Sequence, residues 1–174
     1  MPRRITHGDA EAVLNAFGTG GRVILRNGHT AEAAPADFFG SHGSIRPFRH
    51  SLWDRRHFCA EDWHVILAAM IDGGDASFDH EQAQALQGVT ISFTLDGAPL
   101  ETTRTPIQPF LNPQAFGMER AWYFQEGRIM SPTDLSVGQH ELSARFTDPA
   151  TGLDDRDGIR FDIDAAGTGA CLSD

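Results

Sequence analysis

The feature that most constrains the fold is a pair of alternating segments near the end of the chain. Apolar or aromatic side chains alternate with polar ones from Gln139 to Thr147, and again from Ile159 to Asp164. Successive side chains of a β-strand point to opposite faces, so each segment can bury one face and expose the other. The residues between them, 148–158, are rich in Asp, Gly and Pro, which favour turns. The pattern predicts the closing hairpin of an antiparallel β-sandwich, with His140 buried, hydrogen-bonded and not catalytic.

Further strand signals begin near residue 58, at the spacing that is typical of a sandwich. They predict strands over residues 63–71, 89–95, 101–110 and 121–130. Proline cannot donate to a ladder, so the proline-rich segment 102–120 is expected to be an edge strand or a crossing loop. Its apolar residues could form a flap that lines a ligand pocket, although such residues more often cover one end of a core.

Turn and helix signals occur before these strands and between them. Asp96 and Gly97 predict a turn directly after the strand 89–95. Asp9 could cap a short helix over residues 9–17, and Asp79 could cap a helical turn over residues 79–86. The sequence therefore predicts an all-β fold, an immunoglobulin-like antiparallel sandwich over residues 58–174 with one or two short helices. Residues 1–57 are expected to form an irregular N-terminal extension packed on the sandwich.

One run of residues in the hairpin region resembles a known class of modules. Leu135-x-x-Gly138-x-His140-x-Leu142, followed by Thr147-Asp148, is similar to the late strands of bacterial immunoglobulin-like or fibronectin-type extracellular modules. The first half of the chain matches no sandwich pattern. The resemblance implies an adhesive, carbohydrate-binding or spacer module.

The two cysteines, Cys59 and Cys171, are predicted to form a disulfide. Cys171 lies in a Gly/Ala-rich tail that is hard to explain as core, and a bond to Cys59 would hold that tail down. Such a bond indicates an oxidising compartment, and hence a secreted or cell-envelope protein whose leader is absent from this chain. The alternative is two free cysteines and a cytoplasmic protein.

Composition excludes some functions. The net charge is -10, which argues against general nucleic-acid binding because that requires a basic surface. No apolar run is long enough to cross a bilayer, and the first residues are not a convincing signal peptide.

The strongest candidate site is a basic and aromatic island within residues 46–64. Guanidinium groups bind carboxylates or phosphates, and indole rings stack on sugars or cations. The residues expected to line a ligand site are Arg49, Trp53, Arg56 and His57. The alternative interpretation is a loop whose arginines pair with the protein's own carboxylates.

Two metal sites are weaker hypotheses. His50, His57 and His64 are seven residues apart and would share a face only on one long helix, which makes zinc doubtful. Asp72, Asp75 and Asp79 flank a Gly-Gly pair and could bind calcium through their oxygens. The later acidic group, from Asp148 to Asp157, is expected to be an exposed hairpin turn.

Three classes of function remain open. The first is a non-catalytic binding module of a secreted or envelope protein, with a glycan, an anionic small molecule or a protein as ligand. The second is an enzyme on the same scaffold that uses His50, Asp54 or His57 for acid–base chemistry and arginine to stabilise an anion. The third is a structural assembly subunit. The sequence favours the first and leaves the oligomeric state open.

Overall fold

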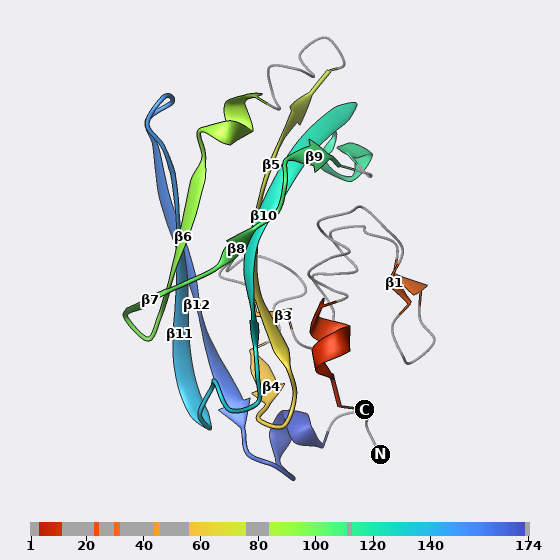
Figure 1. The fold of residues 1–174 in the computed structure, drawn as a ribbon, viewed down its shortest axis with the longest axis vertical. Helices are drawn as coiled ribbons and strands as arrows, with labels where there is room; N and C mark the ends of the chain where they lie inside the picture. The colour runs from red at the N-terminus through yellow and green to blue at the C-terminus, as the bar shows by residue number, and fades with distance from the viewer. Residues whose placement is uncertain are drawn as a thin grey trace.

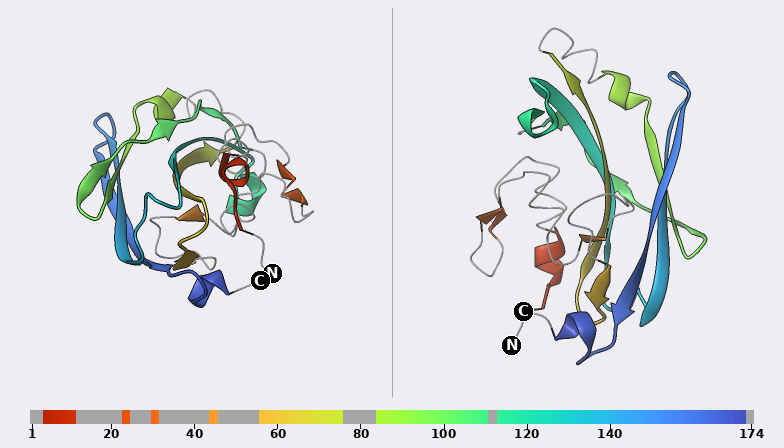
Figure 2. Two further views of the ribbon diagram at one scale, coloured as in Figure 1. Left: turned by 60° about the horizontal axis from the view of Figure 1, so that its bottom comes forward. Right: turned by 180° about the vertical axis from the view of Figure 1, so that it is seen from behind.

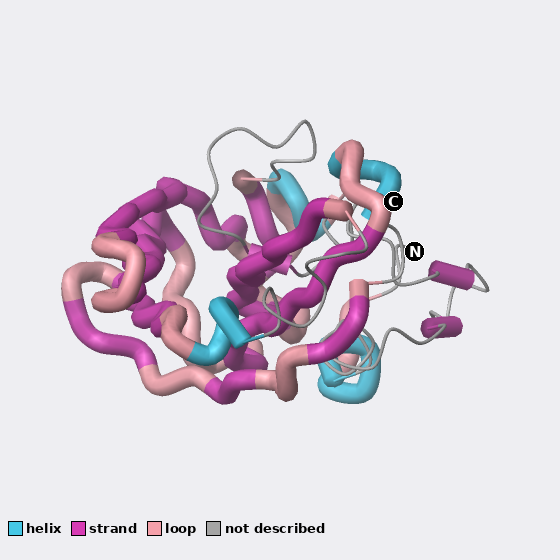
Figure 3. Tube along the Cα trace, turned by 90° about the horizontal axis from the view of Figure 1, so that it is seen from above, coloured by secondary structure: helices cyan, strands magenta, loops and turns pink. Residues whose placement is uncertain are grey.

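The protein is a sandwich of two five-stranded β-sheets (Figure 1). It is described from a computed structural model, which places residues 4–11, 23–24, 30–31, 44–45, 56–75, 84–110 and 113–172. A separate two-stranded ribbon pairs β1 (Val23–Ile24) with β2 (Thr30–Ala31). The described helical segments are short, and strands predominate (Figure 3). In these described ranges no helix has the length and apolar character that a bilayer span requires.

The first sheet, called the β11 sheet, has the strand order β4-β12-β11-β6-β7. Its strands are β4 (His57–Cys59), β6 (Thr90–Leu95), β7 (Ala98–Leu100), β11 (Gly138–Asp148) and β12 (Leu153–Asp164). All pairs are antiparallel except β4 and β12, which run parallel.

The second sheet, called the β10 sheet, has the order β3-β5-β10-β8, and β9 also pairs with β10. Its strands are β3 (Ser44–Ile45), β5 (His64–Gly74), β8 (Thr103–Arg104), β9 (Gln108–Pro109) and β10 (Arg120–Met130). The short strand β3 runs parallel to β5, and the other pairs are antiparallel.

This connectivity is immunoglobulin-like. The hairpin of β11 and β12 lies beside β6 in one sheet, whereas β5 and β10 are neighbours in the other, so the chain alternates between the sheets as in that fold. The predicted fold class is therefore confirmed. The protein lacks the inter-sheet disulfide of antibody domains, because its two cysteines are joined to each other at the end of the sandwich.

The main core lies between the two sheets. Alternate residues of β6, β11 and β12, such as Phe93, Leu142 and Phe161, face the inner residues of the β10 sheet, such as Ile66 and Phe124. All five are almost fully buried. The two-residue alternation of the sequence thus predicts the inner face of the β11 sheet correctly.

A second core covers the opposite face of the β10 sheet. Strand β5 is buried without interruption from His64 to Ala68, so it has apolar neighbours on both faces. Val65 and Leu67 pack with Ala10 of the N-terminal helical segment, residues 7–11. This segment lies on the side of β5 and β10 that faces away from the β11 sheet (Figures 1 and 2). A strand with two buried faces loses the simple alternation, which explains why β5 reads as a continuous apolar run.

The N-terminal helix begins earlier than the sequence predicts. Thr6, and not Asp9, is its N-cap: the Asp9 backbone N–H donates to Thr6 Oγ1 at 3.3 Å, and the Thr6 N–H donates to Asp9 Oδ2 at 2.8 Å. This reciprocal arrangement is a capping box, with the acidic residue in the first turn. Residues 12–17 of the predicted helix lie outside the described residues.

The closing hairpin is longer than predicted. Strand β12 begins at Leu153, so the turn occupies only residues 149–152, and the acidic residues Asp154, Asp155 and Asp157 belong to a strand. The reason is a local side-chain acceptor. Asp148 is buried, and its carboxylate accepts the Ala150 N–H at 3.0 Å and the Thr151 hydroxyl at 2.9 Å, which closes the turn within four residues.

Two other sequence predictions are confirmed with changes in detail. Asp96 and Gly97 form the β6–β7 turn with positive φ angles of 51° and 81°, which is why Asp and Gly occur there.

The predicted strand 101–110 is divided into β8 and β9, both at the edge of the β10 sheet. Phe110 follows β9 and packs its ring against Tyr123, with 5.3 Å between ring centroids. Of the turn predicted over 79–86, the structure describes helical residues from 84 to 87.

Candidate functional site

The predicted ligand site falls partly within the described residues. Arg49, His50, Trp53 and Asp54 lie outside them. Arg56 and His57 are described, and both are exposed at the start of β4. The geometry of the site is therefore given by β4, by the end of β12 and by the short 3-10 helix η3 (Gly169–Cys171).

Strand β4 is held against the end of β12 by parallel pairing. The Asp162 N–H donates to the Arg56 carbonyl at 2.7 Å, and the Ala60 N–H donates to the Asp164 carbonyl at 2.9 Å. The register places His57 opposite Asp162 and Cys59 opposite Asp164. His57 consequently lies on the outer face of the sheet, whereas Phe58, the next residue of β4, is buried in the core.

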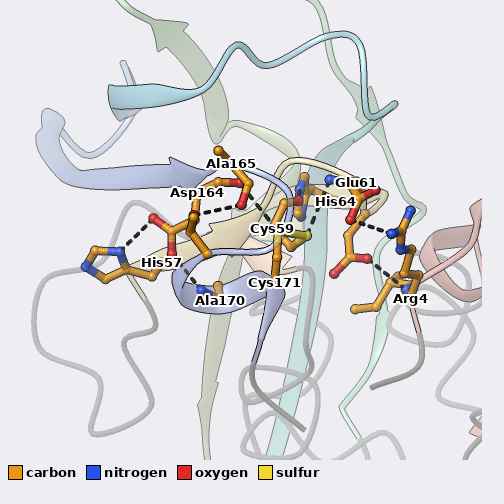
Figure 4. The surroundings of a disulfide bond; sticks show 12 residues. Arg4, His57, Cys59, Glu61, His64, Asp164, Ala165, Ala170 and Cys171 are labelled. Atoms are coloured by element: carbon orange, nitrogen blue, oxygen red, sulfur yellow. Dashed lines mark hydrogen bonds and ion pairs between the residues drawn. A yellow bond between two sulfur atoms is a disulfide. The ribbon is translucent and has the colours of Figure 1, made fainter. Parts of the chain in front are cut away.

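A carboxylate fixes the His57 ring. Its Nδ1 lies 3.2 Å from Asp164 Oδ1, and because an ionised carboxylate can only accept, Nδ1 is the donor (Figure 4). The other oxygen of Asp164 accepts the Ala170 N–H of η3 at 2.7 Å. The side chain of His57 is 63% exposed, so this oriented imidazole faces solvent. Sequence reasoning missed Asp164, because only the fold brings it to a residue 107 positions away.

The Cys59–Cys171 disulfide, which the sequence predicts, lies directly beside this pair. The two Cα atoms are 4.7 Å apart, and the bond joins β4 to η3. The Glu61 backbone N–H donates to Cys59 Sγ at 3.4 Å, and Glu61 forms an ion pair with Arg4 at 2.5 Å (Figure 4). Such a bond is compatible with an oxidising compartment.

The helical arrangement considered for zinc does not occur. His57 belongs to β4 and is exposed, whereas His64 is the first residue of β5 and is buried. His64 Nε2 donates to the Cys59 carbonyl at 3.0 Å, and its ring contacts Phe58 edge-on. His64 therefore has a structural role in the core. His50 lies outside the described residues.

The calcium hypothesis remains a prediction. Asp72 lies within β5, opposite Trp122, and Asp75 follows the strand, whereas Asp79 is outside the described residues. Within the described ranges, one close group of potential metal ligands is found, Cys59, Glu61 and Cys171. Its two sulfur atoms are bonded to each other.

The outer face of the β11 sheet extends from β4, its edge strand, across β12 and β11. No described element covers this face (Figure 1). Arg145 binds Asp154 through two hydrogen bonds of 2.8 and 2.7 Å, and Arg160 binds Glu141 at 3.0 Å. All four of these side chains are exposed. The pairing with Asp154 raises the pKa of Arg145 and lowers that of Asp154.

Between these two ion pairs runs a row of small residues. Thr94 and Gly158 are the cross-strand neighbours of Ser143, and the hydroxyls of Thr94 and Ser143 are 2.5 Å apart. A Cβ at Gly158 would lie 3.1 Å from the Leu142 carbonyl oxygen, so a larger residue would crowd the sheet there. The outer face is thus flat in the middle and charged on either side. The polar residues of the alternating pattern predict this exposed face. The pattern does not indicate which of these residues form ion pairs with one another.

His140 is buried and hydrogen-bonded, as the sequence predicts, and it also forms an ion pair with Asp96. Its ring is 8% exposed and stacks on Phe161. Its Nδ1 lies 2.7 Å from Asp96 Oδ2, and its Nε2 lies 2.7 Å from the Ser136 carbonyl oxygen. Both partners are acceptors, so both ring nitrogens carry protons and the ring is an imidazolium.

The electrostatics agree with this assignment. Burial alone would lower the pKa of His140, but the Ser136 carbonyl, the hydrogen bond and charge of Asp96 and the charge of Asp162 together raise it. For Asp96, burial opposes ionisation, yet the Glu141 N–H and His140 outweigh burial and lower the pKa of Asp96.

Arg104 is a second charged group that serves the fold. Its guanidinium donates to the carbonyls of Val89 at 2.6 Å and Leu86 at 3.1 Å, and it lies 3.5 Å above the centre of the Phe124 ring. Burial lowers the pKa of Arg104, and the charge of Glu126 opposes that effect. Arg104 connects the edge of the β10 sheet to the start of β6, which makes it unsuited to binding a ligand.

No protein-family model matches the chain, and no curated protein matches it.

Proposed function

We propose that the protein is a non-catalytic binding module of a secreted or cell-envelope protein and that its ligand is a glycan. The observation that supports this proposal is the outer face of the β11 sheet, which is exposed and carries oriented hydrogen-bonding groups, with His57 on its edge strand and Arg56 directly before that strand.

The chemistry of this face suits hydroxyl groups. Guanidinium groups donate, carboxylates accept, and the Ser and Thr hydroxyls of the central row can do either. Because Arg145 and Arg160 are each held by a carboxylate, less side-chain freedom is lost when a ligand binds. Neighbouring sugar hydroxyls can bridge such a donor–acceptor pair, and the flat central row lets a ring lie close to the sheet.

The charge around His57 favours a neutral glycan over an anionic ligand. Asp162 is opposite His57 in the register, and Asp164 contacts its ring, so two carboxylates stand beside it. An anion at this position would be repelled by both. The other residues of the predicted site, Arg49 and Trp53, lie outside the described residues.

The His57–Asp164 pair also favours a second candidate function, that of an enzyme. A carboxylate that orients an imidazole is the arrangement that general base catalysis requires. Catalysis would also need a concave site around His57. Hydrolysis of a bound glycan that is lost in His57→Gln would therefore support the enzyme and contradict the non-catalytic module.

The decisive experiment is a binding screen of the oxidised protein against soluble oligosaccharides, followed by mapping of backbone amide shifts by NMR. We expect shifts to concentrate on β11, β12 and β4, and the double variant Arg145→Ala/Arg160→Ala to weaken binding at least about tenfold, which corresponds to about 1.4 kcal/mol. Arg120→Ala, an exposed arginine of the β10 sheet, is the matched control. Shifts confined to the β10 sheet, or equal affinity in the double variant, would contradict this location.

A further inference from the structure

The geometry points to the Cys59–Cys171 disulfide as an exchangeable, regulatory bond. We propose that an external dithiol reductant attacks Cys171, releases η3 from β4 and thereby frees the carboxylate that orients His57. The exchange reaction is independent of the proposed function. Its effect on ligand binding rests on that function, because His57 lies on the proposed glycan-binding face.

The two sulfur atoms differ in their surroundings. Cys59 is 5% exposed and lies in β4, on the face of the strand opposite Phe58. Cys171 is only partly buried and lies in η3, a helix of three residues whose N-cap, Thr168, makes no side-chain capping bond. The next residue, Leu172, is 65% exposed. An incoming thiolate therefore reaches Cys171 more easily than Cys59.

The leaving group is also better placed at Cys59. When a thiolate attacks Cys171 Sγ, a new S–S bond forms there, the bond between the cysteines breaks, and its electron pair leaves on Cys59 Sγ. The Glu61 N–H, 3.4 Å from that atom, is positioned to stabilise the developing thiolate. The second thiol of the reductant then attacks the mixed disulfide, which releases Cys171 and the oxidised reductant. Two electrons pass to the cysteines, and both thiolates are protonated by solvent.

Breaking the disulfide is expected to affect His57 as well as the C-terminal segment. Once the disulfide is broken, η3 is joined to the end of β12 by the Ala170 N–H on Asp164 Oδ2 and by Cys171 Sγ, which lies 3.5 Å from the Asp164 carbonyl oxygen. That carboxylate is the same one that holds His57 Nδ1 (Figure 4). Gly169 lies so close to Asp164 that a Cβ there would collide with its carboxylate. The tail and the imidazole thus share one acceptor, and release of the tail removes a constraint on His57.

The test of the exchange step uses the intact oxidised protein and glutathione as a monothiol probe. After a brief reaction, free thiols are blocked with N-ethylmaleimide and the products are mapped by mass spectrometry. We expect glutathione on Cys171 and the blocking group on Cys59, in about tenfold excess over the reverse arrangement. Modification mainly at Cys59, or reduction only at the rate of global unfolding, would overturn the proposal.

The test of the regulatory step uses dithiothreitol and NMR, and it needs no glycan. In the reduced protein, circular dichroism should retain its strand signal, while the Ala170 amide and the His57 ring resonances move. Cys171→Ser should reproduce the reduced spectrum, and Leu172→Ser, which keeps the disulfide, should not. Loss of the fold on reduction, or unmoved His57 resonances, would show that the bond is only structural. Glycan affinity is then compared between the oxidised and reduced forms, so that a failed glycan screen leaves the exchange result standing.

Discussion

The buried imidazolium of His140 makes the stability of the protein depend on pH in a defined direction. The informative substitution is Asp96→Asn. Asn tolerates the left-handed backbone at this position, where φ is 51°, and its side-chain oxygen can still accept the Glu141 N–H. The substitution therefore removes both the charge opposite His140 and the oxygen that accepts the His140 Nδ1–H, because the amide NH2 group takes the place of Asp96 Oδ2.

The magnitude follows from the geometry. Two unit charges about 4 Å apart interact by about 4 kcal/mol at an effective dielectric constant of about 20. Asp96 is 49% exposed, so solvent screens much of that energy. A hydrogen bond to a charged group contributes about 1.5–3 kcal/mol net. We therefore expect Asp96→Asn to lower the free energy of unfolding by about 2 kcal/mol at pH 5–6.

The pH dependence has two limits. The raised pKa of His140 stabilises the fold fully below the pKa of an unfolded histidine, about 6.5, and this contribution is lost as the pH rises through the folded pKa. The lowered pKa of Asp96 stabilises the fold above about pH 3.8, and this contribution is lost as the pH falls through the folded pKa. The difference between wild type and Asp96→Asn should thus be largest between about pH 4 and 6.5.

The assay is urea unfolding of both proteins from pH 4 to 9, together with an NMR titration of the His140 ring. Glu141→Gln is the control, because Glu141 is an exposed neighbour on the same strand and should change stability by no more than about 0.5 kcal/mol. A difference between wild type and Asp96→Asn that is the same at pH 5 and pH 9 would refute the reasoning. So would a His140 ring that titrates below the pKa of free histidine.

Three further predictions concern the stability of the fold. Replacing Cys59 and Cys171 by serine should lower the free energy of unfolding by up to about 4–5 kcal/mol, since the bond spans 112 residues, and urea unfolding without reductant measures the loss. Gly169→Ala should cost about 1–3 kcal/mol, because φ is 44° and the added methyl group meets a carboxylate; an unchanged melting temperature would contradict this. Arg104→Met should cost about 2–4 kcal/mol through the loss of two carbonyl bonds, whereas the exposed Arg156→Met should stay within about 0.5 kcal/mol.

Much of the β11 sheet could be predicted from the sequence because its strands are buried on one face only. The alternation in β11 and β12 assigns Leu142 and Phe161 to the core and leaves Glu141 and Arg160 in solvent, and the structure confirms each position. The β6–β7 turn was also predictable, because Asp96 and Gly97 suit positive φ angles. In each case the signal is local, a period of two or a residue type that one backbone conformation requires.

Long-range partners could not be predicted in the same way. The sequence placed His140 on a buried face but could not supply Asp96, which is 44 residues away and reaches it only because β6 pairs with β11. Likewise Asp164 meets His57 only through the parallel pairing of β4 with β12. The disulfide was predicted because it would hold the C-terminal segment against the sandwich. The structure adds that the disulfide lies beside the His57–Asp164 pair.

The sequence by itself thus determined strands β5, β6, β10 and β11, the core face of the last hairpin and the cysteine pairing, since these depend on local alternation and on residue chemistry. Only the tertiary structure decided that β5 is buried on both faces, that Asp154 and Asp157 belong to a strand, and that Asp164 holds both His57 and η3. These depend on which surfaces meet. The environment of a side chain is set by residues that are distant in the sequence. The local sequence pattern indicates only the backbone conformation of that segment.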